Sequence, residues 1–143
     1  MSRSFSLFIN FDGNCREALE FYAKVFQSEV QGLMSYGQLP TGDGYIVADE
    51  DREHILYCSV HIFGCNVMFC DVPSNMPLTR GDNISPTLGT DDKEEIRRIF
   101  AELSQGGEVL MALDKTFWSE LYGMVQDKYG IIWQLSHDNG GMA

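Results

Sequence analysis

The sequence of 143 residues carries one pattern twice, and this internal repeat is the feature that most limits its possible folds. Two segments, 14–26 and 91–107, have the apolar spacing of amphipathic helices. Their apolar stripes match at a constant offset of 78 positions: Ala18 with Ile96, Phe21 with Ile99, Tyr22 with Phe100, and Val25 with Leu103. A strand-like segment beginning with Glu-Val follows each helix, at 29–37 and 108–113. The sequence therefore predicts two copies of one structural unit.

Further strand-like segments surround both helices. Alternating apolar residues predict a strand at 5–11, and a short strand at 84–90 takes the same place before the second helix. Residues 54–71 predict two strands joined by a turn, and 127–136 predict a turn followed by a strand. A further turn is expected at 39–44, which contains two glycines and a proline. Each half thus has the order strand, helix, strand, strand, strand.

The turns give the register between the two halves. Gly64 matches Gly130, and this alignment sets Met68 against Gln134. In the last strand Ile131, Trp133 and Leu135 share one face, so Gln134 lies on the opposite face. An amide inside an otherwise apolar strand suggests a polar site on that face.

A proline- and glycine-containing stretch at 72–83 separates the halves. We therefore expect a single domain, 1–143, of two pseudo-repeats, with a first module at about 1–71, a linker at 72–83 and a second module at 84–143. The fold class is α+β, with helices covering one face of each sheet and the opposite faces free to enclose a cleft.

Composition limits the partners. The formal net charge is −11, which argues against binding to nucleic acid or to an anionic membrane. The charge suits a cationic ligand, although solubility alone explains it. The chain has no apolar run of membrane-spanning length, and its four cysteines form no metal-binding spacing. We expect a cytoplasmic protein with reduced thiols.

Helix ends are also marked. Asn14, followed by Glu17 three positions later, predicts a capping box for the first helix. The acidic run at 90–95 fits the start of the second helix, where acids interact favourably with the helix dipole. Neither feature requires a functional explanation.

Two segments, 11–26 and 114–136, resemble the PhnB-like branch of the vicinal oxygen chelate superfamily, which includes glyoxalases and bleomycin-resistance proteins. The branch is often labelled as demethylubiquinone-methyltransferase-like. The resemblance implies two tandem βαβββ modules that form a curved sheet around a concave cavity, and it implies a homodimer. It covers nearly the whole chain.

Metalloenzymes of that superfamily place two metal ligands in each module. Carried over by strand register, the resemblance places the four positions near Ser6, Met68, Ser85 and Gln134. Two hydroxyls, a thioether and an amide make a poor site for Mg²⁺, Ni²⁺ or Zn²⁺, which prefer carboxylate, imidazole or thiolate ligands. We therefore expect no metal cofactor.

The remaining polar and aromatic residues with the right strand parity are candidate cavity residues. The expected ligand-binding set is Phe8, Asn10, Tyr57, Ser59, His61, Met68, Ser85, Trp118, Tyr122 and Gln134. His61 is either a general base or a hydrogen-bonded wall residue. Trp118 either forms an aromatic wall for a planar or cationic ligand or packs in a core or dimer interface.

Other chemistry is less well supported. Glu120 becomes a candidate for proton transfer if it is buried beside Trp118, and is a surface acid if it is exposed. Cys58 and Cys70 lack a visible activating base. The chain has no phosphate-binding glycine motif and no room for a nucleotide-binding sheet, so we find no support for S-adenosylmethionine-dependent methyl transfer.

Two functions remain in competition. The first is a small-molecule-binding protein whose ligand is unidentified and which lacks the usual metal. The alternative is an enzyme with a proton-transfer step, of lyase, isomerase or dioxygenase type, that uses His61 or Glu120, with or without metal assistance. Nothing favours a scaffold role.

Overall fold

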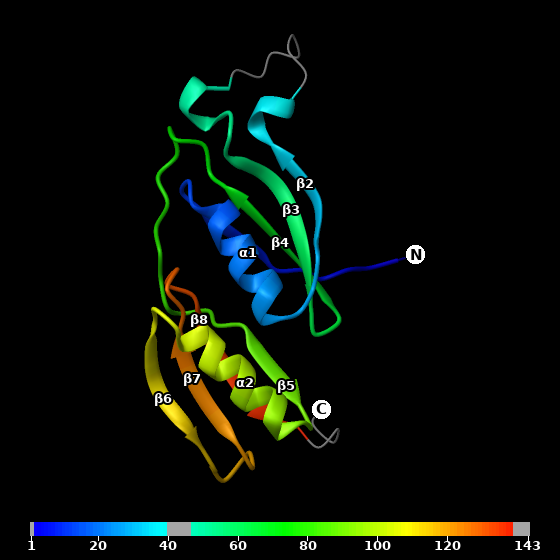
Figure 1. The fold of residues 1–143 in the computed structure, drawn as a ribbon, viewed down its shortest axis with the longest axis vertical. Helices are drawn as coiled ribbons and strands as arrows, with labels where there is room; N and C mark the ends of the chain where they lie inside the picture. The colour runs from blue at the N-terminus through cyan, green and yellow to red at the C-terminus, as the bar shows by residue number, and fades with distance from the viewer. Residues whose placement is uncertain (1, 40–46, 139–143) are drawn as a thin grey trace. The chain divides into compact units, whose positions relative to one another are not determined.

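The structure is a computed structural model that describes residues 2–39 and 47–138 and divides the chain into two compact units, Met1–Thr79 and Arg80–Ala143. The turn expected at 39–44 lies almost wholly outside the described residues. The first unit contains β1 (Phe8–Phe11), α1 (Cys15–Val25), β2 (Val30–Ser35), two short 3₁₀ turns η1 (Tyr36–Gln38) and η2 (Asp49–Asp51), β3 (Ile55–Ile62) and β4 (Cys65–Asp71) (Figure 1).

The second unit repeats this order. It contains β5 (Thr87–Thr90), α2 (Lys93–Ser104), β6 (Glu108–Asp114), β7 (Tyr122–Gln126) and β8 (Ile132–His137). The predicted α+β class and the two tandem βαβββ modules are therefore confirmed. In the described residues, no helix is long and apolar enough to cross a membrane.

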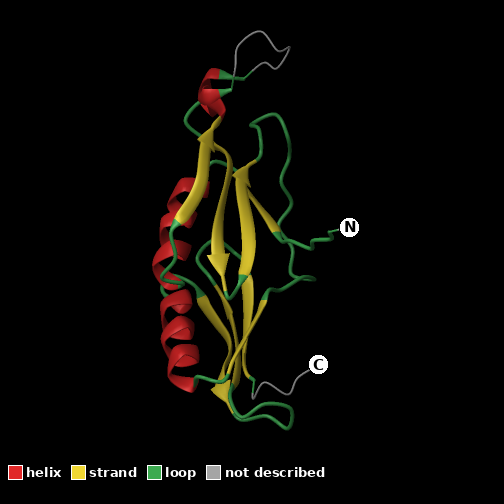
Figure 2. Cartoon of the chain, turned by 90° about the vertical axis from the view of Figure 1, so that its right-hand side faces the viewer, coloured by secondary structure: helices red, strands yellow, loops and turns green. Residues whose placement is uncertain are grey.

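Each unit builds one four-stranded sheet with the same topology. The strand orders are β1-β4-β3-β2 and β5-β8-β7-β6, with the first pair parallel in each sheet and the other pairs antiparallel. Each helix covers one face of its own sheet (Figure 2). We call the opposite face of each sheet its open face.

The helix-covered faces hold the apolar core. In the first unit the Tyr22 ring stacks on Phe69 of β4, with ring centroids 5.5 Å apart. In the second unit Ile96, Leu103 and Trp133 are almost fully buried. The matching stripes seen in the sequence are thus the helix faces that pack on the two sheets.

Gly123 lets α2 approach β7 closely. A Cβ atom at this position would lie 2.8 Å from the Phe100 ring and 2.9 Å from Leu113. Glycine is required here for close packing between helix and sheet. Since position 123 faces α2, its neighbours Tyr122 and Met124 face the open side.

Three local predictions are wrong, and two of them concern the first strand of each unit. β1 begins at Phe8 and not at residue 5, and β5 begins at Thr87 and not at residue 84. Phe5 is 97% exposed, so it gains no burial that would extend the strand.

The third concerns the start of the first helix, because Asn14 does not cap α1 through its side chain. Instead the Asp71 carboxylate, from the end of β4, accepts hydrogen bonds from the backbone N–H groups of Gly13 at 2.7 Å and Cys15 at 3.0 Å. The second helix is capped locally, since Asp92 Oδ1 accepts from Glu94 and Glu95.

The last hairpin is organised by a buried acid. The Asp127 carboxylate accepts from the backbone N–H groups of Tyr129 and Ile131 and from the Trp133 indole at 2.9 Å. Gly130 completes the turn with a φ of +91°, a conformation that favours glycine. Ile131 therefore belongs to this turn, and the strand begins one residue later.

Candidate functional site

Gln134 lies at the centre of a chain of three polar side chains on the open face of the second sheet. The Tyr122 hydroxyl on β7 donates to Gln134 Oε1, and Gln134 Nε2 donates to Ser85 Oγ at 2.7 Å. Tyr122 is buried, and this burial raises the pKa of its phenol, so the hydroxyl stays protonated at neutral pH. The amide is thus fixed at both ends.

Strand register explains why these side chains meet. Gln134 is paired with Met124 on β7 and with Thr87 on β5, and Met124 is in turn paired with Met111 on β6. These paired residues form a row across the sheet. Ser85 lies just before β5, so its hydroxyl reaches the amide from the edge of the sheet.

Trp118 is placed beside this polar chain by the connection between β6 and β7. Its ring lies 5.2 Å from the Tyr122 ring at an angle of 71°, and 51% of its surface is exposed. The connection is anchored by Ser119, whose buried Oγ accepts from the backbone N–H of His137 and from the Ser136 hydroxyl, both at 3.1 Å. A large aromatic surface is therefore held in the open next to fixed polar groups.

The first unit presents a corresponding row on its own open face. This row runs across the sheet from Phe8 on β1 to Met68 on β4, Ser59 on β3 and Gln31 on β2, each paired with the next. The Phe8 and Tyr57 rings meet edge to face with centroids 6.3 Å apart. The predicted candidates of this half thus share one face of one sheet.

Three further residues complete this face. The Cys70 thiol lies 3.1 Å from Asn10 Oδ1, across the parallel pair β1 and β4. His61 is exposed and is paired with Asn66 at the hairpin end of β3. Sequence reasoning missed Gln31 and Cys70 here, although the alternation of their strands contained the signal.

The second open face also has members that the sequence reasoning missed. Met111, Met124 and Thr87 share the row with Gln134. Met124 and Thr87 could have been found from strand parity, as Gln134 was. Met111 could not, because β6 has register shifts along its pairing with β7.

The two positions carried over from metalloenzymes in the second module do come together, since Ser85 and Gln134 are hydrogen-bonded. In the first module the backbone N–H of Met68 donates to the Leu7 carbonyl oxygen, and in the second that of Gln134 donates to the Pro86 carbonyl oxygen. Leu7 thus corresponds to Pro86, and Ser6 corresponds to Ser85. These side chains do not fit a divalent ion, because hydroxyl, thioether and amide are poor ligands and both polar atoms of the amide have protein partners. Within residues 2–39 and 47–138, no group of three or more His, Cys, Asp or Glu side chains could hold a metal.

Neither candidate for proton transfer is buried. Glu120 is exposed, so it lacks the burial that the proton-transfer hypothesis requires. His61 is exposed in the other unit. Burial raises the pKa of Cys70 from 9.0 to about 11, so its thiol is protonated at neutral pH and is a weak nucleophile.

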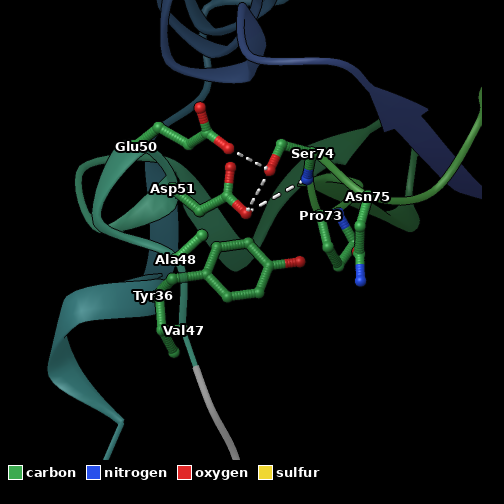
Figure 3. A pocket seen from close by; sticks show the side chains of 8 residues that line it. All are labelled: Tyr36, Val47, Ala48, Glu50, Asp51, Pro73, Ser74 and Asn75. Carbon is green, nitrogen blue, oxygen red and sulfur yellow. Dashed lines mark hydrogen bonds between the residues drawn. The ribbon is translucent and has the colours of Figure 1, made fainter.

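A pocket of about 330 Å³ lies at the other end of the first unit and was not predicted (Figure 3). Glu50 and Asp51 form the acidic side of this pocket. The Ser74 hydroxyl oxygen lies 2.9 Å from the Glu50 carboxylate and 3.0 Å from the Asp51 carboxylate. The Ser74 backbone N–H also donates to Asp51, and Asp51 Oδ1 lies 3.5 Å from Nδ1 of His54. Asp51 is only 4% exposed. These contacts tie the start of the linker to η2, which gives the acids a structural role.

Comparison with known proteins places the chain among its relatives. Residues 3–136 match the family described as 3-demethylubiquinone-9 3-methyltransferase. Protein YjdN of Escherichia coli is 28% identical over 144 residues, covering 92% of this chain and 92% of YjdN. The structure of PA1353 from Pseudomonas aeruginosa has a TM-score of 0.86 at 28% identity, over 96% of this chain and 98% of that one.

Two further structures support the same placement. The PhnB protein of Bacillus cereus has a TM-score of 0.77 at 27% identity, over 95% of this chain and all of that one. A glyoxylase/bleomycin resistance protein/dioxygenase domain from Frankia is 8% identical, with a TM-score of 0.64 over 99% of this chain and 96% of that one, and so shows the fold alone. Since the family match spans nearly the whole chain, this protein belongs to the PhnB-like family described as 3-demethylubiquinone-9 3-methyltransferase, and it shares the fold of the glyoxylase/bleomycin resistance protein.

Proposed function

We propose that this protein binds a small organic molecule on the open face of its second sheet. The observation that carries the proposal is the side-by-side placement of an exposed indole, Trp118, and a fixed polar chain, Tyr122–Gln134–Ser85. Small-molecule sites combine aromatic surface with a few oriented polar groups, and this combination is present here. We further propose that the candidates on the open face of the first sheet, Phe8 and Tyr57 among them, form a ligand-contacting surface of that sheet.

We propose that binding requires no metal and involves no methyl transfer. The donor set at the four carried-over positions is a poor match for a divalent ion. The family takes its description from a methyltransferase, but a description alone does not assign that activity to this chain. We also infer a homodimer, the state that the family resemblance implies.

Proton-transfer catalysis has weaker support. An acid or base for such a step is normally held in a cavity with a shifted pKa. Glu120 and His61 are both exposed, and no contact with a second catalytic group supports either of them. Binding without chemistry is therefore the function that these residues favour.

Nuclear magnetic resonance of the ¹⁵N-labelled protein tests the proposal, because the two indoles report on different environments. Trp118 is exposed at the proposed site, whereas the Trp133 indole is buried and hydrogen-bonded to Asp127. In a screen of planar fragments we expect binders to shift the Trp118 indole and the Gln134 amide signals and to leave Trp133 nearly unchanged. Binders that consistently shift other regions would disprove the proposed location.

A further inference from the structure

We propose that the site selects an uncharged planar ligand that carries a carbonyl-type oxygen, held by the free hydrogen-bond donors of Gln134 and Ser85. This inference rests on the proposed function and specifies its ligand class. Two features carry it: the hydrogen-bond donors that stay free after Tyr122, Gln134 and Ser85 have bonded to one another, and the charges near these three side chains.

The donor inventory gives two free hydrogens. The Gln134 amide has two N–H hydrogens, and one of them is used on Ser85. The Ser85 hydroxyl accepts that bond, and its own proton has no acceptor among the residues that the structure describes. The second amide hydrogen likewise has no acceptor in the described part of the chain. The second amide N–H diverges by about 120° from the N–H that Ser85 accepts, whereas the Ser85 O–H can rotate, so a ligand oxygen on this side can accept from either hydrogen.

The number of free donors does not depend on which way the amide is turned, but the hydroxyl that supplies one of them does. If the Gln134 amide were rotated by 180°, its nitrogen would donate to Tyr122 and its oxygen would accept from Ser85. The free hydrogens would then be the Tyr122 hydroxyl proton and the second amide N–H. In both orientations one hydroxyl and one amide hydrogen remain, so the ligand must supply an acceptor, and the Ser85→Ala test below distinguishes the orientation that leaves the Ser85 proton free.

Charge favours a neutral ligand. Trp118, Tyr122, Gln134 and Ser85 carry no formal charge at neutral pH, so a charged ligand group would lose its hydration without a counter-ion here. An anion would in addition meet a chain of net charge −11. Among the residues paired with these strands, Asp114 is the acid beside Tyr122. Its carboxylate is exposed and accepts a hydrogen bond from the Lys115 backbone N–H at 2.7 Å. Solvent screens this carboxylate, so its attraction for a cation is small.

Geometry favours a planar group beside that oxygen. The Trp118 ring meets Tyr122 at 71° and Phe117 at 83°, both edge to face, and still has half of its surface exposed. Indole surface that stays exposed can pack against an aromatic ring. A ligand with a carbonyl next to an aromatic ring would thus use the indole and one of the free donors together.

Three probes of nearly equal size separate the possibilities: benzamide, benzoate and benzylammonium. They carry a neutral carbonyl, an anion and a cation on the same ring. Titration of the labelled protein, followed through the Trp118 indole signal, is expected to show benzamide binding with a Kd of roughly 1 to 10 mM, as is usual for fragments. Benzoate and benzylammonium are expected to bind at least about tenfold more weakly.

Variants connect this selectivity to the named donors. Ser85→Ala removes one donor and is expected to weaken benzamide binding roughly fivefold. Ser104→Ala, on the exposed end of α2, is the matched control and is expected to change nothing. Asp114→Asn is also expected to leave benzamide binding unchanged.

The outcomes distinguish the two proposals. If a charged probe shifts Trp118 and binds as tightly as benzamide or more tightly, the ligand class is wrong and the binding site stands. Unchanged benzamide binding in Ser85→Ala would likewise overturn the donor assignment. If no probe shifts Trp118, both the ligand class and the proposed site are wrong.

Discussion

At the scale of single residues, the buried acid Asp71 does the most to hold the first unit together. Its carboxylate accepts from the backbone N–H groups of Gly13, Cys15 and Ile55 at 2.7 to 3.0 Å, and the residue is 1% exposed. Its backbone oxygen accepts from the Tyr36 hydroxyl at 2.7 Å. One side chain thus connects the start of α1, the start of β3 and the end of β4.

We expect Asp71→Asn to lower the free energy of unfolding by about 2 to 4 kcal/mol, because the amide offers one acceptor oxygen where the carboxylate offered two, and turns an NH₂ group toward backbone donors. Urea denaturation would measure the loss. Asp82→Asn, in an exposed stretch, is the control and should cost less than about 0.5 kcal/mol. Equal stability of the two variants would contradict the role assigned to Asp71.

The two thiols of β4 should differ in reactivity. Cys65 is exposed, whereas burial raises the pKa of Cys70 to about 11. Since the thiolate is the reactive form, we expect iodoacetamide at pH 8 to modify Cys65 first, with the rate at Cys70 rising as the pH approaches 11. Mass spectrometry of digested protein would measure both rates. Faster modification of Cys70 at pH 8 would contradict its half-buried environment.

At the scale of elements, the sequence predicted positions that depend on periodicity and missed those that depend on distant contacts. The parity of β8 placed Gln134 on the face opposite Trp133, and the structure confirms that placement. The cap of α1 was assigned to Asn14, because capping was considered only within the neighbouring residues. The actual acceptor, Asp71, is 56 residues from Cys15 and has no local signature.

The contact between α2 and β7 gives a second stability prediction. In Gly123→Ala the new methyl group would lie 2.8 to 3.1 Å from Phe100, Leu113 and the Met111 carbonyl oxygen. We expect a loss of about 1 to 3 kcal/mol from overpacking, measured by thermal or urea denaturation. Gly81→Ala is the control, since its Cβ would meet only Asn83 Oδ1 at 3.6 Å. A neutral Gly123→Ala would show that α2 can move away from the sheet at little cost.

At the scale of the whole molecule, the sequence shows the repeat because each helix packs one apolar stripe on its own sheet. Both stripes have the same i, i+3, i+4, i+7 spacing, at a constant offset of 78 positions. The two βαβββ units could therefore be predicted. The pocket beside η2 could not, because Asp51 and Ser74 are 23 residues apart in turns without periodicity.

The metal content of the purified protein tests the proposal that ligand binding requires no metal. For untagged protein purified without chelators, we expect elemental analysis to find well under about 0.2 divalent metal ions per chain, because the donor groups near Ser85 and Gln134 bind such ions poorly. The apoprotein should also show no increase in melting temperature with added Ni²⁺, Zn²⁺ or Mg²⁺. About one ion per chain would contradict the proposal of metal-free binding.

The different caps of the two helices have a consequence for the order of folding. Asp92 bonds to residues two and three positions away, so the start of α2 can form as soon as that short segment orders. The start of α1 stays incomplete until β4 is in place and brings Asp71 to it. Two units with one topology are thus expected to fold by different routes, the second from a locally nucleated helix and the first only after its sheet has closed a long loop.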